Sequence, residues 1–317
     1  MITLDRLSKR YGDKTAVSDL SFAINPGKVT GFLGPNGAGK STTMRMIVGL
    51  DSPTSGRALV GGKRYQELRH PLREVGALLD ARAGHPGRSA YHHLLGMARS
   101  NGVPASRVEE VLDTVGLTEV ARKRVGSFSL GMGQRLGIAA ALLGDPEVLL
   151  FDEPVNGLDP DGVRWVRELM RSLAAEGRTV FVSSHLMSEM QETADHLLVI
   201  GRGKIITDAP IEEVIAGSSL TAVRVRTPRP DVLRRELLQS GMRVDQDAVS
   251  APEELLVVGG DLEEIGELAF NHRVPIHELS MRRASLEQAY MELTAASVEY
   301  GSPTLPQVTE APDHQKA

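Results

Sequence analysis

The sequence has 317 residues, of which 41% are hydrophobic and 24% are charged, and its formal net charge is −5. This composition is that of a folded protein with a sizeable core, and it gives no overall basic field for nucleic acid or acidic lipid. The absence of cysteine excludes disulfides, thiol catalysis and cysteine-ligated zinc or iron–sulfur sites. We expect no signal peptide and no membrane span, because no apolar run approaches 18 residues.

The first fifty residues predict short strands, a glycine-rich loop and a helix, in that order. Strands are expected at residues 1–4, 19–24 and 29–33. The helix is expected at about residues 40–48, directly after the glycine-rich loop. A phosphate site on a parallel sheet requires this succession of strand, loop and helix.

Residues 85–145 predict an all-helical insertion, because Pro and Gly interrupt helical patterns at residues 91–99 and 108–115. The sheet is expected to resume after the insertion. Its further elements are predicted at residues 148–151, 163–175, 179–183, 196–200 and 204–207. We therefore expect one α/β domain with a parallel core sheet over residues 1–215.

A second, smaller unit is expected at residues 220–295. Its predicted order is strand, helix, strand, strand, helix, strand, which is typical of a small split βαβ domain of the α+β kind. We find no motif in this unit that carries chemistry, so a structural or dimer-supporting role is favoured over a regulatory small-molecule site. Residues 297–317 are rich in Pro, Gln, Thr and Ala, a composition typical of disorder.

The glycine-rich loop matches the G-x-x-x-x-G-K-[ST] phosphate-binding pattern in full. Its glycines let several backbone N–H groups converge on one anion, and the following helix points its positive dipole end at the same place. Lys40 can reach the β- and γ-phosphates, and the hydroxyl of Ser41 can ligate Mg²⁺. A glycine-rich turn that binds nothing would not explain the strand before it and the helix after it. The loop therefore predicts ATP and Mg²⁺ as cofactors, bound by Gly34, Asn36, Gly37, Gly39, Lys40, Ser41 and Thr42.

An acidic pair, Asp152 and Glu153, follows the apolar run at residues 148–151. Doubly wound sheets place ligand-facing groups at the carboxyl ends of such strands. Asp152 is suited to hold Mg²⁺ through water, and Glu153 to orient and polarise the attacking water. Acidic pairs between a strand and a loop are common, but the phosphate loop upstream favours the catalytic interpretation.

Residues 128–135, FSLGMGQR, resemble the signature sequence of ABC ATPases and, in this spelling, its antibiotic-exporter branch. Ser129 and Gly131 are kept, whereas Leu130 and Met132 depart from the consensus Gly and Gln. Ser129 is also a good N-cap, so its hydroxyl and the nearby N–H groups can face an anion. A plain helix cap would be the simpler explanation, but the position shortly before the acidic pair favours the signature.

Three further segments resemble the same family. Residues 156–160, NGLDP, resemble the D-loop, which implies that Asp159 contacts the opposite subunit. Residues 183–185, SSH, resemble the switch segment, which implies that His185 touches the γ-phosphate. Tyr11 resembles the aromatic residue that stacks on adenine.

Asp80 departs from the family pattern. Residues 75–80, VGALLD, resemble the Q-loop, whose last residue is normally a glutamine that reaches the metal and the attacking water. Asp80 is therefore expected as a catalytic and metal-binding residue. It can accept a hydrogen bond from a metal-bound water but cannot donate as an amide does. Bacitracin- and lantibiotic-exporter ATPases are similar in placing an acid here, which favours the exporter branch and leaves the role of Asp80 open.

The resemblance implies a P-loop NTPase of the ABC ATPase type, with an N-terminal β subdomain and a helical insertion. It implies an ATP-hydrolysing subunit that powers an ABC transporter, an exporter of drugs, antibiotics or lipid-like molecules. Two copies are expected to enclose two ATP molecules between the phosphate loop of one and the signature of the other. A separate polytopic membrane permease is expected to hold the pair at the cytoplasmic face of the membrane.

The alternative is a non-transport ABC ATPase that acts on nucleic acid or the ribosome. Such proteins usually carry two fused ATPase units, coiled-coil arms or basic patches, whereas this sequence has one motif set, no useful heptad run and an acidic balance. We therefore expect no nucleic acid partner. A P-loop kinase would leave the segments at residues 128–135 and 183–185 unexplained.

Overall fold

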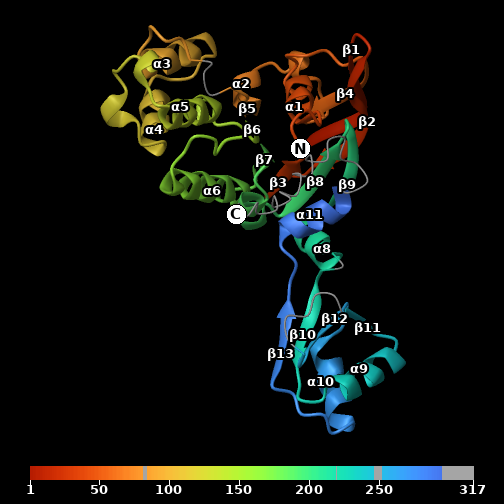
Figure 1. The fold of residues 1–317 in the computed structure, drawn as a ribbon. Coiled ribbons are helices and arrows are strands. Elements are labelled where there is room, and N and C mark those ends of the chain that lie inside the picture. Colours follow the sequence, from red (N-terminus) through yellow and green to blue (C-terminus); the bar gives the residue numbers. More distant parts are fainter. Residues whose placement is uncertain (81–83, 219, 246–251, 295–317) are drawn as a thin grey trace, which may run out of the picture.

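The computed structural model describes residues 1–80, 84–218, 220–245 and 252–294. Figure 1 shows a large body at the top and a smaller one below it, joined by extended segments. The disorder expected at residues 297–317 lies outside the described residues.

A six-stranded sheet with the order β5-β6-β7-β3-β8-β9 forms the centre of the large body. All neighbouring strands pair in parallel except β8 and β9. The inner strands are almost continuously buried and apolar, as strands covered on both faces are. The predicted parallel core sheet is confirmed. Its strands are β3 (Lys28–Leu33), β5 (Val75–Leu78), β6 (Val148–Asp152), β7 (Thr179–Ser184), β8 (His196–Gly201) and β9 (Lys204–Pro210).

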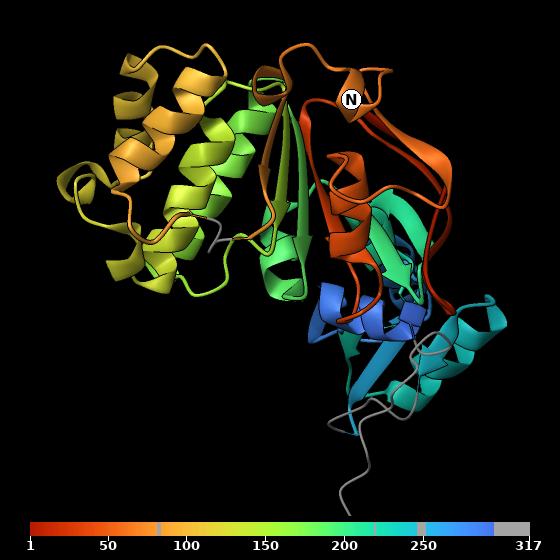
Figure 2. The same cartoon turned by 90° about the horizontal axis from the view of Figure 1, so that it is seen from above.

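Alternate residues of the central strands enter two different cores. Phe32 and Phe181 point to one face, where their ring centroids lie 5.1 Å apart and they pack with the N-terminal strands and α1 (Lys40–Ile47). Val180 and Val182 point to the other face, which packs against α6 (Pro160–Ala175) and α7 (Met187–Thr193). Figure 2 shows the sheet standing between α1 on one side and the helices on the other.

The first core is completed by a three-stranded antiparallel sheet with the order β2-β1-β4. Its strands are β1 (Ile2–Tyr11), β2 (Lys14–Ile24) and β4 (Ser55–Val60). The first two strands extend well beyond the predicted ranges, and β4 was not predicted. Only part of each strand is buried, so the exposed, polar remainder carries no apolar signal.

A helical layer lies beside the edge strand β5 (Figure 1). Its main helices occur where the insertion was expected, and their buried residues, such as Leu94, Val111 and Ile138, share a core with the sheet. Its helices are α2 (Pro71–Glu74), α3 (Ala90–Ser100), α4 (Ser106–Thr114) and α5 (Leu130–Leu142). Short 3₁₀ turns occur at Tyr65–Glu67, Thr118–Val120 and Val125–Ser127.

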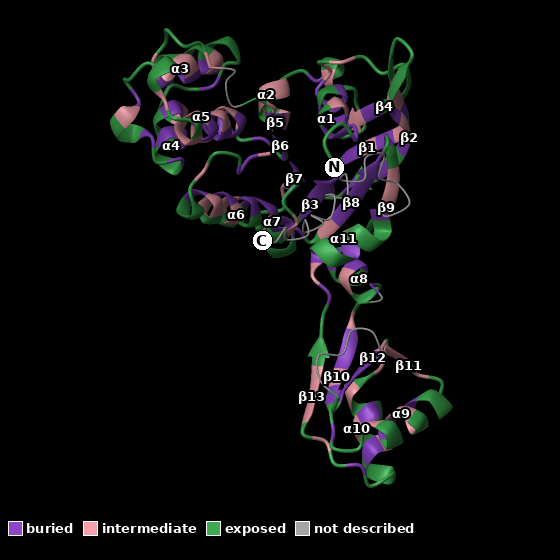
Figure 3. Cartoon of the chain, viewed as in Figure 1, coloured by how far each residue is buried: buried purple, intermediate pink, exposed green. Residues whose placement is uncertain are grey.

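The smaller body has a four-stranded antiparallel sheet with the order β11-β12-β10-β13, and its elements follow the predicted succession along the chain. Val223, Leu255 and Ile265 are fully buried in its separate core, visible as the purple interior in Figure 3. Its elements are β10 (Ala222–Arg226), α9 (Pro230–Gln239), β11 (Arg243–Asp245), β12 (Glu254–Val258), α10 (Leu262–Asn271) and β13 (Glu278–Arg282).

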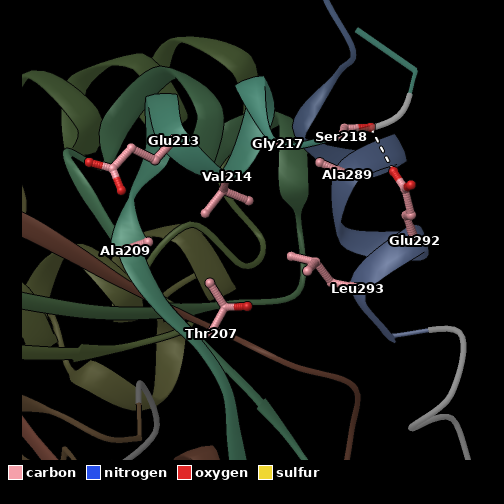
Figure 4. Close-up of a pocket in the computed structure, with 9 residues that line it drawn as sticks. All are labelled: Thr207, Ala209, Glu213, Val214, Gly217, Ser218, Ala289, Glu292 and Leu293. Carbon is pink, nitrogen blue, oxygen red and sulfur yellow. Dashed lines mark hydrogen bonds between the residues drawn. The ribbon is translucent and has the colours of Figure 1, made fainter. Parts of the chain in front are cut away.

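The helix after this unit, α11 (Leu286–Thr294), returns to the large body and packs on α7 and α8 (Ile211–Ala216). Leu286 and Ala289 are buried in the same core as α7, and Leu286 N–H donates to Gln191 Oε1 at 2.8 Å. A cavity of about 340 Å³ lies between β9, α8 and α11, where Ser218 Oγ donates to Glu292 Oε2 at 2.8 Å (Figure 4). The division of the chain at about residue 215 stays a prediction, and α11, within the range expected for the smaller unit, packs on the larger one.

Replacing Leu286 with alanine should loosen this docking by about 2–4 kcal/mol, because a fully buried leucine loses its contacts and leaves a cavity. Backbone amides of α11 should then exchange with solvent about 30-fold faster or more, measured by hydrogen–deuterium exchange. Met291 lies on the same helix and is 61% exposed, so Met291→Ala should leave the exchange rate nearly unchanged. Equal acceleration in both variants would contradict the docking.

Candidate active site

The glycine-rich loop joins β3 to α1 and is pressed against neighbouring backbone. Gly39 has φ +110°, and a Cβ there would lie 2.7 Å from the carbonyl oxygen of Ala16. A Cβ on Gly34 would collide with the carbonyl oxygen of Ile200. Glycine is therefore required at both positions by the fold, while Asn36 and Gly37 are exposed at the tip of the loop.

Lys40 is the first residue of α1 and is only 6% exposed. Its Nζ donates to the carbonyl oxygen of Gly34 at 2.6 Å and lies 4.0 Å from Glu153 Oε1. Burial lowers the pKa of Lys40, and the nearby carboxylates of Glu153 and Asp152 partly oppose this shift. The ammonium is thus fixed between the phosphate loop and the acidic pair.

Ser183, on β7, joins the two acidic residues. It pairs in register with Asp152 on the neighbouring strand β6, and its Oγ donates to Asp152 Oδ1. The same oxygen accepts from Glu153 N–H at 3.0 Å, and Ser183 is fully buried. Ser183 was not predicted as a site residue; its signal in the sequence is a serine directly after the apolar run of a fully buried strand.

Glu153 faces the loop in an uncommon backbone conformation, with φ +51°. His185, which follows β7, places Nδ1 2.7 Å from Glu153 Oε2. The structure therefore brings Lys40, Asp152, Glu153 and His185 together at the carboxyl edge of β3, β6 and β7. This is the arrangement that a base for attack on a loop-bound phosphate requires.

Oxygen donors for a divalent cation are present at the same edge. The described residues contain no group of three His, Cys, Asp or Glu side chains that could hold a metal. Mg²⁺ is usually bound by one or two protein oxygens, with waters and phosphate oxygens completing its shell. Ser41, which is exposed in the first turn of α1, and the Asp152 carboxylate fit this pattern. Asp80 lies exposed two residues beyond β5.

Tyr11 is the last residue of β1, and Thr42 belongs to the first turn of α1. Tyr11 Oη donates to Asp51 Oδ2 at 3.0 Å, and Lys9 Nζ lies 4.8 Å from the centre of its ring. Tyr11 is about half exposed, and adenine stacking stays a prediction. Thr42 is half-buried in the first turn of α1.

Ser129 and Asp159 are both helix N-caps. Ser129 Oγ accepts from Met132 N–H at 3.2 Å at the start of α5, and Asp159 Oδ1 accepts from Gly162 N–H at 2.9 Å at the start of α6. A Cβ on Gly131 would lie 3.2 Å from the carbonyl oxygen of Gly157, so the two segments touch. Their expected contacts with a second subunit stay predictions.

Comparison with known proteins identifies the family. Residues 17–156 match the ABC transporter family, and residues 221–287 match a domain of unknown function, DUF8746. Over 302 residues the chain is 35% identical to an uncharacterized ABC transporter ATP-binding protein, YhcH, of Bacillus subtilis, covering 94% of this chain and 97% of that one. Over 211 residues it is 42% identical to the bacitracin transport ATP-binding protein BcrA of Bacillus licheniformis, covering 66% and 69%.

A solved structure shares the fold. It is a dimeric ATP-binding cassette in a post-hydrolysis state bound to ADP and phosphate, with a TM-score of 0.61 and 23% identity. The match covers 66% of this chain and 98% of that one. At this identity the likeness concerns the fold alone.

The sheet, the phosphate loop and the acidic pair at its edge define a P-loop ATPase that binds and hydrolyses ATP. Among P-loop proteins, the chain belongs to the ATP-binding proteins of ABC transporters. No helix in the part of the chain that the structure describes is long and apolar enough to cross a membrane.

Proposed function

We propose that this ATPase powers an exporter of antibiotic-type or lipid-like compounds, and that it acts as a pair of identical subunits bound to a separate membrane permease. The similarity to the bacitracin transport protein supports export of this class of compound. Asp80 stands where ABC ATPases usually have a glutamine, and this supports the antibiotic-exporter branch of the family. The permease would hold the pair at the cytoplasmic face of the membrane.

The separation of the phosphate loop from the signature within one chain carries the proposal of a pair. Figures 1 and 2 both show α1, which follows the loop, and α5, which begins after Ser129, with strands of the central sheet between them. The N-terminus of α5 is suited to an anion, yet the loop of its own chain lies elsewhere. A second copy lets the signature of one subunit close over nucleotide held by the loop of the other.

Within that site each residue has a defined task. Lys40 and the N–H groups of the loop bind the β- and γ-phosphates. Glu153 orients the attacking water and accepts its proton, and His185 holds the Glu153 carboxylate and reaches the γ-phosphate. Ser41 and Asp152 would hold Mg²⁺, which supplies charge neutralisation at the phosphates. Catalysis then rests on positioning and electrostatic stabilisation of the transferred phosphoryl group.

Pairing can be tested with a variant that binds ATP without consuming it. Purified Glu153→Gln should sediment as a monomer without nucleotide and as a dimer with ATP and Mg²⁺, measured by analytical ultracentrifugation. Adding Ser129→Arg should abolish the dimer, because a bulky cation replaces the cap that faces the partner's nucleotide. A dimer that forms equally well with Ser129→Arg would contradict the shared site.

The transport role needs the permease. Co-expression with a polytopic membrane protein encoded beside this chain should give a complex whose ATPase activity in liposomes rises with an exported peptide antibiotic such as bacitracin. Association with nucleic acid or ribosomes, without any membrane protein, would favour a non-transport ABC ATPase.

A further inference from the structure

The carbonyl group of Glu153 is held by a side chain from a different element. Nε2 of Gln134, on α5, donates to Glu153 O at 3.0 Å, and Gln134 is only 3% exposed. A buried amide that lost this partner would leave an unpaired donor, which is unfavourable. The bond therefore fixes α5 relative to the segment that follows β6.

Glu153 needs such support because its backbone lies in the left-handed region. For a residue with a Cβ, this conformation is unfavourable and persists only where the surroundings hold it. Ser183 Oγ accepts from its N–H at 3.0 Å. On the other side its carbonyl accepts from Gln134 and, at 3.3 Å, from Asn156 N–H. The backbone clamped in this way aims the carboxylate at His185.

We propose that Gln134 is a positioning residue for ATP hydrolysis, which aims the Glu153 carboxylate by holding its carbonyl group. This inference rests on the proposed role of Glu153 as the base. Gln134 and Ser129 belong to the same helix, since Ser129 caps α5. A shift of α5 when Ser129 meets the partner's nucleotide is therefore transmitted to Glu153, so that each subunit's signature is linked to its own hydrolytic site.

The near-isosteric variant Gln134→Met removes the donor and keeps the volume. We expect kcat to fall about 10- to 100-fold, because small displacements of a catalytic group have effects of this size, while KM and the ATP dissociation constant stay within about twofold. Thr227, fully buried in the smaller body, donates from Oγ1 to Pro275 O at 2.8 Å. Thr227→Val removes the same kind of bond away from the site and should leave kcat unchanged.

A double variant separates positioning from a general loss of structure. In the Glu153→Gln background, Gln134→Met should lower residual hydrolysis no further, because both changes act through one carboxylate. Independent, multiplicative losses would overturn the inference. Wild-type hydrolysis by Glu153→Gln would refute the role of Glu153 itself, whereas an inactive Glu153→Gln with normal kcat in Gln134→Met would refute only the role of Gln134.

A second variant covers the case in which Gln134→Met does not fold. Gln134→Asn keeps a buried amide but is one methylene shorter, so it cannot donate to Glu153 O with the same geometry. We expect a loss of kcat of similar size, with ATP binding retained. Wild-type kcat in Gln134→Asn would overturn the inference.

Discussion

Replacing Glu153 with glutamine should lower kcat for ATP hydrolysis about 100- to 1,000-fold while leaving ATP affinity within about twofold of wild type. General base catalysis contributes about 10²- to 10⁴-fold, and an amide of the same shape cannot accept the proton of the attacking water. Binding should persist, because the phosphate loop and Lys40 are unchanged. His185 Nδ1 can still contact the amide oxygen in place of Glu153 Oε2.

Phosphate release under saturating ATP measures the loss, and a fluorescent nucleotide measures the affinity. Glu212, exposed in the first turn of α8, provides a matched control, since Glu212→Gln makes the same chemical change away from the site. Its kcat should equal that of wild type. Normal turnover by Glu153→Gln would show that another group activates the water.

Strands were predicted most accurately where burial is continuous along the chain. Strands β3, β6 and β7 are buried on both faces, so each stands out as an apolar run between turn residues. Strand β4 escaped prediction because its first half is exposed and contains Gly56 at φ +75°. The position of α11 could not be predicted either, because Leu286 and Ala289 find their partners on α7 and α8, far away in sequence.

The residues of the candidate site also differ in whether a local sequence pattern predicts them. Lys40, Asp152 and Glu153 stand beside segments whose patterns are local, so the sequence alone indicates phosphate binding and an acid at the sheet edge. Ser183 and Gln134 act through contacts that only the tertiary structure creates. The contacts of Ser183 depend on the register between β6 and β7. The contact of Gln134 depends on the packing of α5 against the segment after β6.

Replacing Lys40 with methionine should weaken ATP binding about 100-fold or more and abolish measurable hydrolysis. Charge-assisted hydrogen bonds are worth about 1.5–3 kcal/mol each, and two of them to the β- and γ-phosphates account for at least a factor of this size. Isothermal titration with ATP and Mg²⁺ measures the affinity. Affinity within threefold of wild type would show that the ammonium does not contact the phosphates.

The pH dependence of folding provides an independent check that Lys40 is buried in the way its contacts indicate. Its pKa in the folded protein lies below its ordinary value of 10.5 because of burial, so between these two values the unfolded chain binds the proton and the folded chain does not. The contribution of Lys40 to the free energy of unfolding therefore rises with pH over that interval. Lys40→Met lacks the rise, so from pH 8 to pH 10 its free energy of unfolding, measured in urea, should fall relative to wild type. An unchanged difference between the two proteins would mean that Lys40 titrates as it does in the unfolded chain, and that its contacts with Gly34 and the carboxylates fully offset the effect of burial on its pKa.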